Sequence, residues 1–286
     1  GGRSGWNQGA VTQSHATGNV TGTGESVGGL VGWNVSNITE SYATGTVTGD
    51  TKVGGLVGDN YLTAEVSQSY ATGAVSGNTH IGGLVGWHQS GTVTQSHASG
   101  GVTGTDNIGG LVGFNSATVT ESYATGTVSG SRYVGGLVGW NQETITQSHA
   151  TGTVTGDGEA IGGLVGWTSV TVSQSYATGN VSGSAVNLGG LAGSNYGSVT
   201  ESYATGTVTG SGDNVGGLVG KSQNGIINTV YAAGAVSGSN SVGGLIGDAE
   251  GDTVTKVYAT GTVSGTAGVG GLIGTLRAGS GLLSES

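Results

Sequence analysis

Val27-Gly28-Gly29-Leu30-Val31-Gly32-Trp33, followed shortly by Ser41-Tyr42-Ala43-Thr44-Gly45-Thr46-Val47-Thr48, contains the two blocks from which the architecture of this chain can be read. Both blocks recur along the whole sequence in steps of 26 to 28 residues. The first block begins its glycine pair at Gly28, Gly54, Gly82, Gly109, Gly135, Gly162, Gly189, Gly216, Gly243 and Gly270. Such regular self-similarity indicates that each repeat is one structural unit stacked on the next.

The segments within a repeat are short, rich in Val, Thr and Tyr, and separated by Gly, Asn, Asp and Ser. These are signals of strands and turns rather than of helices. The sequence therefore predicts an all-β fold, a parallel β-solenoid (β-helix) of about ten coils, with roughly 27 residues and two or three short strands per coil. We expect one domain over residues 1–286, with partial or capping coils at 1–13 and 274–286.

Composition excludes several classes of protein. The 65 glycines lack the strict every-third spacing of collagen, and the absence of cysteine excludes disulfides and thiolate metal sites. A net charge of −10 repels phosphate backbones, so no nucleic acid partner is expected. No apolar run of about 18 residues occurs, so we expect no membrane span in this segment. Nothing in the sequence indicates a cofactor.

The second block alternates with the period of a strand. Ser41, Ala43, Gly45 and Val47 are predicted to face inward, because the Ala and the Val are unchanged in all ten repeats. The outward set includes a Gln/Glu row in which no Glu lies directly on another Glu, an arrangement that avoids repulsion between neighbouring coils. It also includes a Tyr/His row, formed by His15, Tyr42, Tyr70, His97, Tyr123, His149, Tyr176, Tyr203, Tyr231 and Tyr258.

The first block has apolar residues at both parities of the strand, with Leu30 on one side and Val27, Val31 and Trp33 on the other. A strand that is apolar on both sides is usually buried on both sides, so this face could pack against another copy or another layer. Glycine-induced bends could instead turn both parities inward. The candidate packing face consists of Leu30, Val31, Leu56, Val57, Leu84, Val85, Leu111, Val112, Leu137, Val138, Leu164 and Val165.

A row of aromatic residues follows the first block and is confined to the N-terminal two-thirds of the chain. Its members are Trp6, Trp33, Trp87, Phe114, Trp140 and Trp167. An exposed row at strand spacing could stack on sugar rings or pack against a partner, whereas each Trp could also fold over its own corner. The Thr-x-Thr-x-Thr strip of the second block suggests an ice-binding surface as a further alternative, although Asn19, Ala74 and Gly101 interrupt the array.

The polar constellations do not predict catalysis or metal binding. His15, His97 and His149 lie at least two coils apart, too far to share a metal ion. In each Ser-His pair, adjacent strand residues point to opposite faces and cannot act as nucleophile and base. Asp50, Asp106, Asp157 and Asp213 occupy variable turns without the spacing of calcium-binding β-rolls. We therefore expect that the protein is not an enzyme.

At Gly29-Leu30-Val31-Gly32 and Tyr42-Ala43-Thr44-Gly45-Thr46-Val47-Thr48-Gly49 the chain resembles the GLUG-motif repeats of bacterial and archaeal surface proteins, and the resemblance covers nearly the whole chain. It departs from the pattern at the ends, where Arg3-Ser4 replaces Leu-Val and the last unit runs Gly274-Thr275-Leu276-Arg277-Ala278 and then stops at Ser286. These segments are expected to be either polar caps or junctions.

This resemblance implies large secreted or cell-surface proteins, including adhesins. We expect a non-catalytic extracellular rod that serves as a filament subunit or an adhesin stalk, with a carbohydrate-binding module as the alternative. The expected partners are other copies of the chain, through polymerisation or lateral pairing, and surface glycans or other surface proteins.

Overall fold

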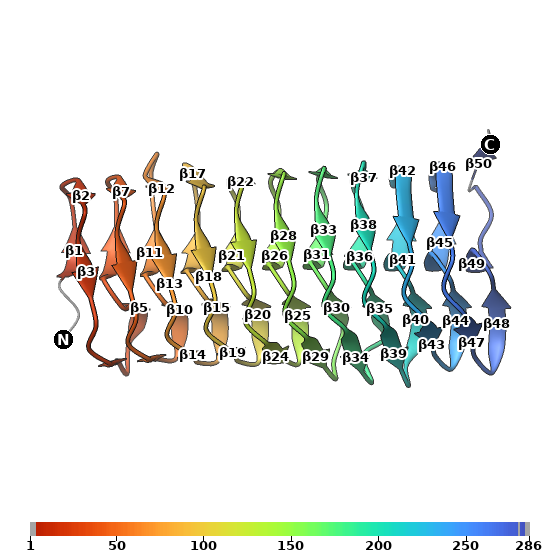
Figure 1. Cartoon of the computed structure of the whole chain (residues 1–286), viewed down its shortest axis with the longest axis horizontal. Helices are drawn as coiled ribbons and strands as arrows, with labels where there is room; N and C mark the ends of the chain where they lie inside the picture. Colours follow the sequence, from red (N-terminus) through yellow and green to blue (C-terminus); the bar gives the residue numbers. More distant parts are fainter. Residues whose placement is uncertain (1–3, 280, 284–286) are drawn as a thin grey trace.

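The computed structural model describes residues 4–279 and 281–283, and these residues form strands, turns and bends without any helix. The coils lie side by side along one long axis, with the two ends of the chain at opposite ends of the rod (Figure 1). The prediction of a parallel β-solenoid of about ten coils with roughly 27 residues each is confirmed. Of the expected end coils, residues 1–3, 280 and 284–286 lie outside the described residues.

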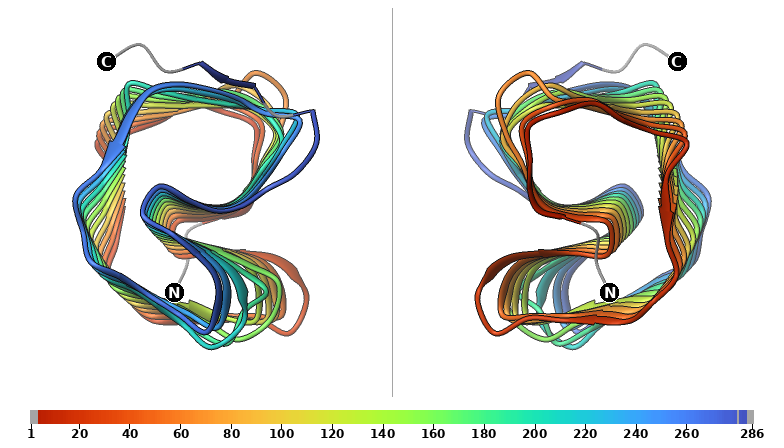
Figure 2. Two further views of the ribbon diagram at one scale, coloured as in Figure 1. Left: turned by 90° about the vertical axis from the view of Figure 1, so that its right-hand side faces the viewer. Right: turned by 90° about the vertical axis from the view of Figure 1, so that its left-hand side faces the viewer.

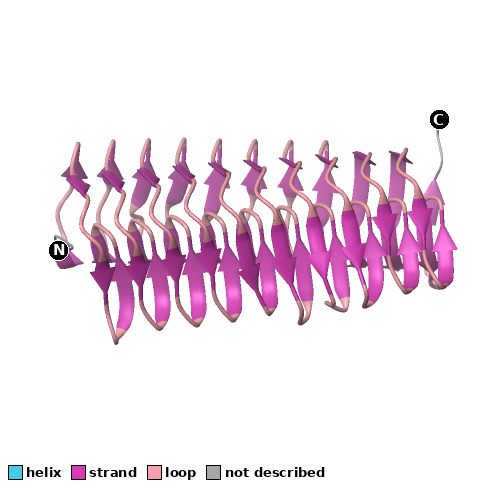
Figure 3. Cartoon of the chain, turned by 60° about the horizontal axis from the view of Figure 1, so that its bottom comes forward, coloured by secondary structure: helices cyan, strands magenta, loops and turns pink. Residues whose placement is uncertain are grey.

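Each coil contains up to five short strand segments, which belong to four parallel sheets that we name A to D. In one coil the chain passes through β5 (Glu25–Gly28) of sheet D, β6 (Val31–Asn34) of sheet A, β7 (Ile38–Thr39) and β8 (Tyr42–Ala43) of sheet B, and β9 (Val47–Thr48) of sheet C. This is more than the two or three strands expected, because bends and turns break each coil at several corners (Figure 3).

Sheets A and D contain the residues on either side of the glycine pair. Sheet A consists of β1 (Ser4–Asn7), β6 (Val31–Asn34), β11 (Val57–Asn60), β16 (Val85–His88), β21 (Val112–Asn115), β26 (Val138–Asn141), β31 (Val165–Thr168), β36 (Ala192–Asn195), β41 (Val219–Gln223), β45 (Ile246–Glu250) and β49 (Ile273–Leu276). Sheet D consists of β5 (Glu25–Gly28), β10 (Thr51–Gly54), β15 (Thr79–Gly82), β20 (Asp106–Gly109), β25 (Arg132–Gly135), β30 (Ala160–Gly162), β35 (Asn187–Gly189), β40 (Asp213–Gly216), β44 (Asn240–Gly243) and β48 (Ala267–Gly270).

Sheets B and C contain the second block. Sheet B consists of β2 (Val11–Thr12), β3 (His15–Ala16), β7 (Ile38–Thr39), β8 (Tyr42–Ala43), β12 (Glu65–Ser67), β13 (Tyr70–Ala71), β17 (Thr92–Thr94), β18 (His97–Ala98), β22 (Thr118–Thr120), β23 (Tyr123–Ala124), β27 (Ile145–Thr146), β28 (His149–Ala150), β32 (Val172–Ser173), β33 (Tyr176–Ala177), β37 (Ser198–Thr200), β38 (Tyr203–Ala204), β42 (Ile226–Ala232), β46 (Thr253–Ala259) and β50 (Gly281–Leu283). Sheet C consists of β4 (Val20–Thr21), β9 (Val47–Thr48), β14 (Val75–Ser76), β19 (Val102–Thr103), β24 (Val128–Gly130), β29 (Val154–Gly156), β34 (Val181–Gly183), β39 (Val208–Gly210), β43 (Val236–Ser237) and β47 (Val263–Ser264).

The cross-section of the rod has two lobes, because each coil folds inward on one side (Figure 2). Two apolar clusters fill these lobes. The cluster between sheets A and B contains Leu30, Val31 and Ala43 with their counterparts in other coils. The cluster between sheets C and D contains Val47 and Val53 with theirs. The inward set predicted for the second block is buried as expected, and Thr44, Thr46 and Thr48 are exposed.

The inward fold is made possible by the glycines of the first block. A Cβ added at Gly28 would lie 1.9 Å from the carbonyl oxygen of Val31, and one at Gly29 would lie 2.2 Å from that of Gly55 and 2.9 Å from Ala43 Cβ. A Cβ at Gly32 would meet the carbonyl oxygen of Ser26 at 2.7 Å. Only glycine therefore allows sheets A and D to lie back to back and to approach sheet B.

This fold corrects one prediction. Leu30 and Val31, with the ten equivalent residues Leu56, Val57, Leu84, Val85, Leu111, Val112, Leu137, Val138, Leu164 and Val165, are at most 1% exposed within the single chain. The candidate packing face is thus core, and the glycine-bend alternative is the one that holds. The physical reason is the reversal at the glycine pair, which changes the direction of the chain between Val27 and Leu30. Val27, before the pair, enters the lobe between sheets C and D, and Leu30 and Val31, after it, both enter the lobe between sheets A and B.

Candidate functional site

The Tyr/His row forms a continuous ladder on the outside of sheet B. Its ten rings stack with centroids 4.6 to 5.1 Å apart and planes inclined by only 1 to 9°. Each ring between the two ends therefore turns its faces toward its neighbours and presents an edge to solvent. A sugar needs an open ring face for stacking, so this ladder does not offer a stacking platform along its length.

The Gln/Glu row runs beside this ladder and supports the stacking. Its glutamates accept hydrogen bonds from the Gln of the preceding coil, from Gln13 to Glu40 (2.8 Å), Gln95 to Glu121 (3.0 Å) and Gln174 to Glu201 (3.0 Å). The spacing of Glu with Gln thus converts a potential repulsion into hydrogen bonds between coils. All ten residues at this corner, including Thr229 and Lys256, have positive φ angles near 50°.

The aromatic row lies in one line on sheet A, but it does not form an open outer face. The rings of Trp33, Trp87, Phe114, Trp140 and Trp167 are only partly exposed, whereas Trp6 is 54% exposed. Within the row the rings contact one another, with Trp140 and Trp167 stacked at 4.1 Å and Trp87 edge-on to Phe114 at 5.3 Å. Asp59 interrupts the row between Trp33 and Trp87.

Side chains of sheet D pack against this row, and we call the contact between them the D–A seam. It pairs residues seven apart in one coil, such as His80 with Trp87 (ring centroids 5.1 Å), Tyr133 with Trp140 (4.5 Å) and Asn187 Nδ2, which donates to Ser194 Oγ (3.0 Å). The expected aromatic row is therefore largely engaged within the chain, in agreement with the alternative that each Trp covers its own corner.

Charged residues enter the seam where aromatic ones are missing. Lys52 Nζ lies 3.0 Å from Asp59 Oδ2, and its ammonium also lies 4.5 Å from the centre of the Trp87 ring. Near the C-terminal end, Arg277 donates to both oxygens of Asp248 at 2.8 to 3.0 Å. Both aspartates occupy the position of the aromatic row, and both are almost completely buried.

An apolar hollow of about 390 Å³ lies near the N-terminal end of the aromatic row. It is lined by Trp6, Trp33, Val35, Tyr61 and Leu62, and Leu62 is 63% exposed. Among the predicted row members, Trp6 and Trp33 are thus the two that border a concave apolar surface. The size is within the range of small-ligand sites.

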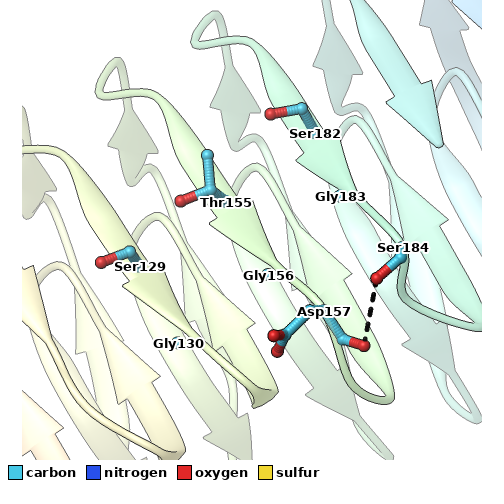
Figure 4. A pocket seen from close by; sticks show the side chains of 8 residues that line it. All are labelled: Ser129, Gly130, Thr155, Gly156, Asp157, Ser182, Gly183 and Ser184. Atoms are coloured by element: carbon cyan, nitrogen blue, oxygen red, sulfur yellow. Dashed lines mark hydrogen bonds between the residues drawn. The ribbon is translucent and has the colours of Figure 1, made fainter. Parts of the chain in front are cut away.

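The Thr/Ser strip does not form a flat array. Gly45 is a corner between sheets B and C, so Thr44 and Thr48 flank a bend and belong to different faces. On sheet C the hydroxyl rows border a shallow polar hollow of about 440 Å³, where Ser129, Thr155 and Ser182 lie on successive strands and Ser184 Oγ donates to the carbonyl oxygen of Asp157 (Figure 4). This curvature and the interruptions weigh against an ice-binding plane.

The serine that begins the second block has a structural role. Ser96 is buried, and its Oγ donates to the carbonyl oxygen of Thr94 (2.8 Å) while accepting from the main-chain N–H of Ser69 (3.1 Å). The adjacent His97 points outward and stacks between Tyr70 and Tyr123. Burial lowers the pKa of His97 and of His149, which favours their neutral forms. The two side chains of the pair point to opposite sides of the strand, as the alternation predicts.

Sequence reasoning missed a buried polar ladder on sheet A, directly after the aromatic row. Asn34 Nδ2 donates to Asn60 Oδ1 (2.7 Å), Asn115 Nδ2 to Asn141 Oδ1 (2.7 Å) and Asn141 Nδ2 to Thr168 Oγ1 (3.1 Å). His88 replaces Asn in this ladder and is fully buried. The recurring Trp-Asn dipeptide was the sequence signal for this ladder. An Asn beside a turn is, however, usually predicted to lie on the surface.

Within residues 4–279 and 281–283, no three His, Asp or Glu side chains gather in a way that could hold a metal ion. The same part of the chain contains no helix long and apolar enough to cross a membrane.

A comparison with protein families gives one match, to a model described as the GLUG motif. It matches residues 23–48, 77–103, 104–129, 130–155, 184–209 and 238–264, which together make up more than half of the chain. Each matched segment is close to one coil in length. No curated protein and no solved structure matches the chain.

Proposed function

Since the chain belongs to the family of GLUG-motif repeat proteins, we propose that it is a rigid, non-catalytic spacer on an extracellular surface, the stalk of an adhesin-like protein. The observation that carries this proposal is the unbroken register of the ladders. Sheet A pairs strand by strand from β1 to β49, and the Tyr/His ladder runs through ten coils without a gap. At a strand spacing of about 4.8 Å, ten coils give a rod roughly 50 Å long.

The same register supports stiffness. Neighbouring coils are joined by main-chain hydrogen bonds in four sheets and by the Tyr/His ladder, and several of them also by hydrogen bonds of the Gln/Glu row and the Asn ladder. Bending therefore requires many contacts to open together. A stalk fits better than a laterally paired filament, because the apolar residues of the candidate packing face are buried inside the chain.

The test is small-angle scattering and negative-stain electron microscopy of the purified chain over a range of concentration and salt. Discrete rods roughly 50 Å long at every concentration would support the stalk. Long uniform fibres that grow with concentration would overturn it and favour a filament subunit.

Carbohydrate binding is a second candidate, favoured by the apolar hollow beside Trp6 and Trp33. An array of neutral oligosaccharides would supply the probes, with quenching of Trp fluorescence as the readout. Trp6→Ala should abolish binding, whereas Trp167→Ala, which removes a ring stacked on Trp140, should leave it unchanged. Binding that survives Trp6→Ala would show that the hollow is not the site.

A further inference from the structure

Lys52, Asp59 and Glu25 meet at one point of the D–A seam. Lys52 lies on β10, Asp59 on β11 of the same coil, and Glu25 on β5 of the preceding coil. Lys52 Nζ is 3.0 Å from Asp59 Oδ2 and 3.6 Å from Glu25 Oε2. The side chains of Asp59 and Lys52 are 0% and 11% exposed, whereas that of Glu25 is 66% exposed.

The carboxyl group of Asp59 has little contact with water. It stands between Trp33 and Trp87 in sheet A, and its Oδ1 accepts one hydrogen bond, from Gln89 Nε2 (3.0 Å). Oδ2 faces Lys52 Nζ across the ion pair, and the side chain of Tyr61 also interacts with this carboxyl group. A buried ion pair gains little from its attraction after both charges have lost their water.

Lys52 and Asp59 can react with each other once a proton has moved from the ammonium group to the carboxylate. Burial raises the pKa of Asp59, which favours the protonated acid that an amine can attack. For Lys52, burial works against the charge, but the hydrogen bond and the charge of Asp59 outweigh it, and its pKa is raised. The amine therefore becomes a nucleophile only once one of its protons has moved to Asp59, and Glu25 provides an acceptor for a second proton next to Nζ that is open to solvent.

We propose that Lys52 and Asp59 become joined by an intramolecular amide bond, with Glu25 as the proton carrier. A proton passes from the Lys52 ammonium to the Asp59 carboxylate, and the Nζ lone pair then attacks Cγ to form the new C–N bond. One C–O bond of the carboxyl group breaks, and its oxygen leaves as water with a second proton from Nζ, relayed by Glu25. Glu25 ends in its starting state, and the reaction needs no oxidant and no cofactor.

Proximity and loss of water favour this step over the resting ion pair. The two groups are held within contact distance by rigid strands, which removes most of the entropic cost of bringing them together. The product is neutral, so it also removes the cost of two buried charges. The bond would link sheet D to sheet A across the inward fold of one coil. Asp248 cannot react in this way, because its partner Arg277 keeps its proton.

The test is the intact mass of the purified full chain, measured under denaturing conditions after incubation of the folded protein near neutral pH. The expected mass is one water molecule below that calculated from the sequence, with fragment ions that place the loss between Lys52 and Asp59 and with no tryptic cleavage after Lys52. Lys52→Arg keeps the positive charge but not the nucleophile, and should have the full mass. Glu25→Gln changes an exposed side chain and should also have the full mass.

A cyclic imide at Asp157-Gly158 would also lose one water, so the lysine variant is the necessary control. The full mass in the unchanged chain would overturn the proposal, and so would a loss of water that persists in Lys52→Arg. A loss that persists in Glu25→Gln would overturn the role of Glu25. Circular dichroism of each variant confirms that the β-solenoid is folded in every comparison.

Discussion

Residues with positive φ, in the left-handed backbone conformation, form many corners of this protein, and most of those in the described part of the chain are not glycine. The Gln/Glu row has positive φ in every coil, and a second such row in sheet D includes Ser26, Lys52, His80 and Tyr133. For an L-residue this conformation is costly, and most of all for a β-branched one. In the Gln/Glu row the strained conformation directs the side chains outward, where glutamates accept hydrogen bonds from the preceding coil. In the sheet D row it directs Lys52, His80 and Tyr133 against the side chains of sheet A.

Thr229 is the β-branched member of the Gln/Glu row, with φ 54°, and its side chain is exposed. Replacing it with Asn, which tolerates this region, should raise the free energy of unfolding by about 1 kcal/mol. Thr253→Asn is the matched control, since Thr253 is exposed in the extended strand β46 and the same change there should be neutral or slightly destabilising. Urea unfolding of both variants measures the difference, and equal effects would contradict the strain argument.

His88 should make the protein sensitive to acid. Burial lowers its pKa to about 4, against a weaker opposing interaction with the main chain of Thr118, and its Nδ1 accepts from Asn60 Nδ2 at 3.2 Å. The unfolded chain takes up this proton near pH 6.5, so the stabilisation is complete above that pH and declines as the pH falls to about 4. Between these two pH values the wild type should lose roughly 3 kcal/mol of its free energy of unfolding because of His88. His88→Asn, which introduces the residue that most other coils have at this position, should remove that loss.

Denaturation midpoints of the wild type and His88→Asn at pH 7 and pH 4.5 provide the measurement. The wild type should lose more stability between the two values than the variant does. Equal losses of stability in the wild type and the variant would mean that the His88 ring can be protonated in the folded protein without destabilising it.

At the scale of the element, the glycine block is the feature that shapes the coil. It lets sheets A and D lie back to back, which creates two thin cores instead of one wide one. The serine that begins the second block also affects the strands. In the last coils Val230 and Val257 replace this serine, and there the two short strands of sheet B merge into the seven-residue strands β42 and β46.

Gly110 and Gly101 give a matched test of this role. A Cβ at Gly110 would lie 2.0 Å from the carbonyl oxygen of Gly136, whereas at Gly101 its nearest neighbour is Thr127 Oγ1 at 3.4 Å. Gly110→Ala should therefore lower the free energy of unfolding by roughly 2 to 4 kcal/mol, because backbone must move. Gly101→Ala should have little effect, since Ala74 occupies the equivalent position. Similar losses for both in urea unfolding would contradict a steric origin.

At the scale of the whole molecule, the protein is a one-dimensional stack in which each coil contacts chiefly its neighbours along the axis. The register pairs equivalent positions of successive repeats, as in Val31 with Val57 and Tyr42 with Tyr70. Stability in such a stack is close to a sum of coil and interface contributions. Coils should therefore be removable as units.

Deleting residues 130–155 removes one complete coil and joins Ser129 to Gly156 in the correct register. The product should fold into a rod shorter by about 4.8 Å, with its Tyr/His ladder continued from Tyr123 to Tyr176. Deleting residues 130–142 alone breaks the period and should prevent folding of the coils around it. Circular dichroism and small-angle scattering distinguish the two, and a folded half-coil deletion would contradict the strict register.

The sequence by itself determined the period, the number of coils, the parallel stacking and the inward side of the second block, because identical residues at a fixed spacing must lie above one another. Only the tertiary structure decided that the first block is buried in the core and that the aromatic row is partly buried in the D–A seam. It also decided the bends that divide each coil into up to five strands, and the Asn ladder. The physical reason is the glycine pair. Alternation predicts sides only while the chain keeps its direction, and at Gly28-Gly29 the absence of Cβ atoms lets the chain reverse toward the axis.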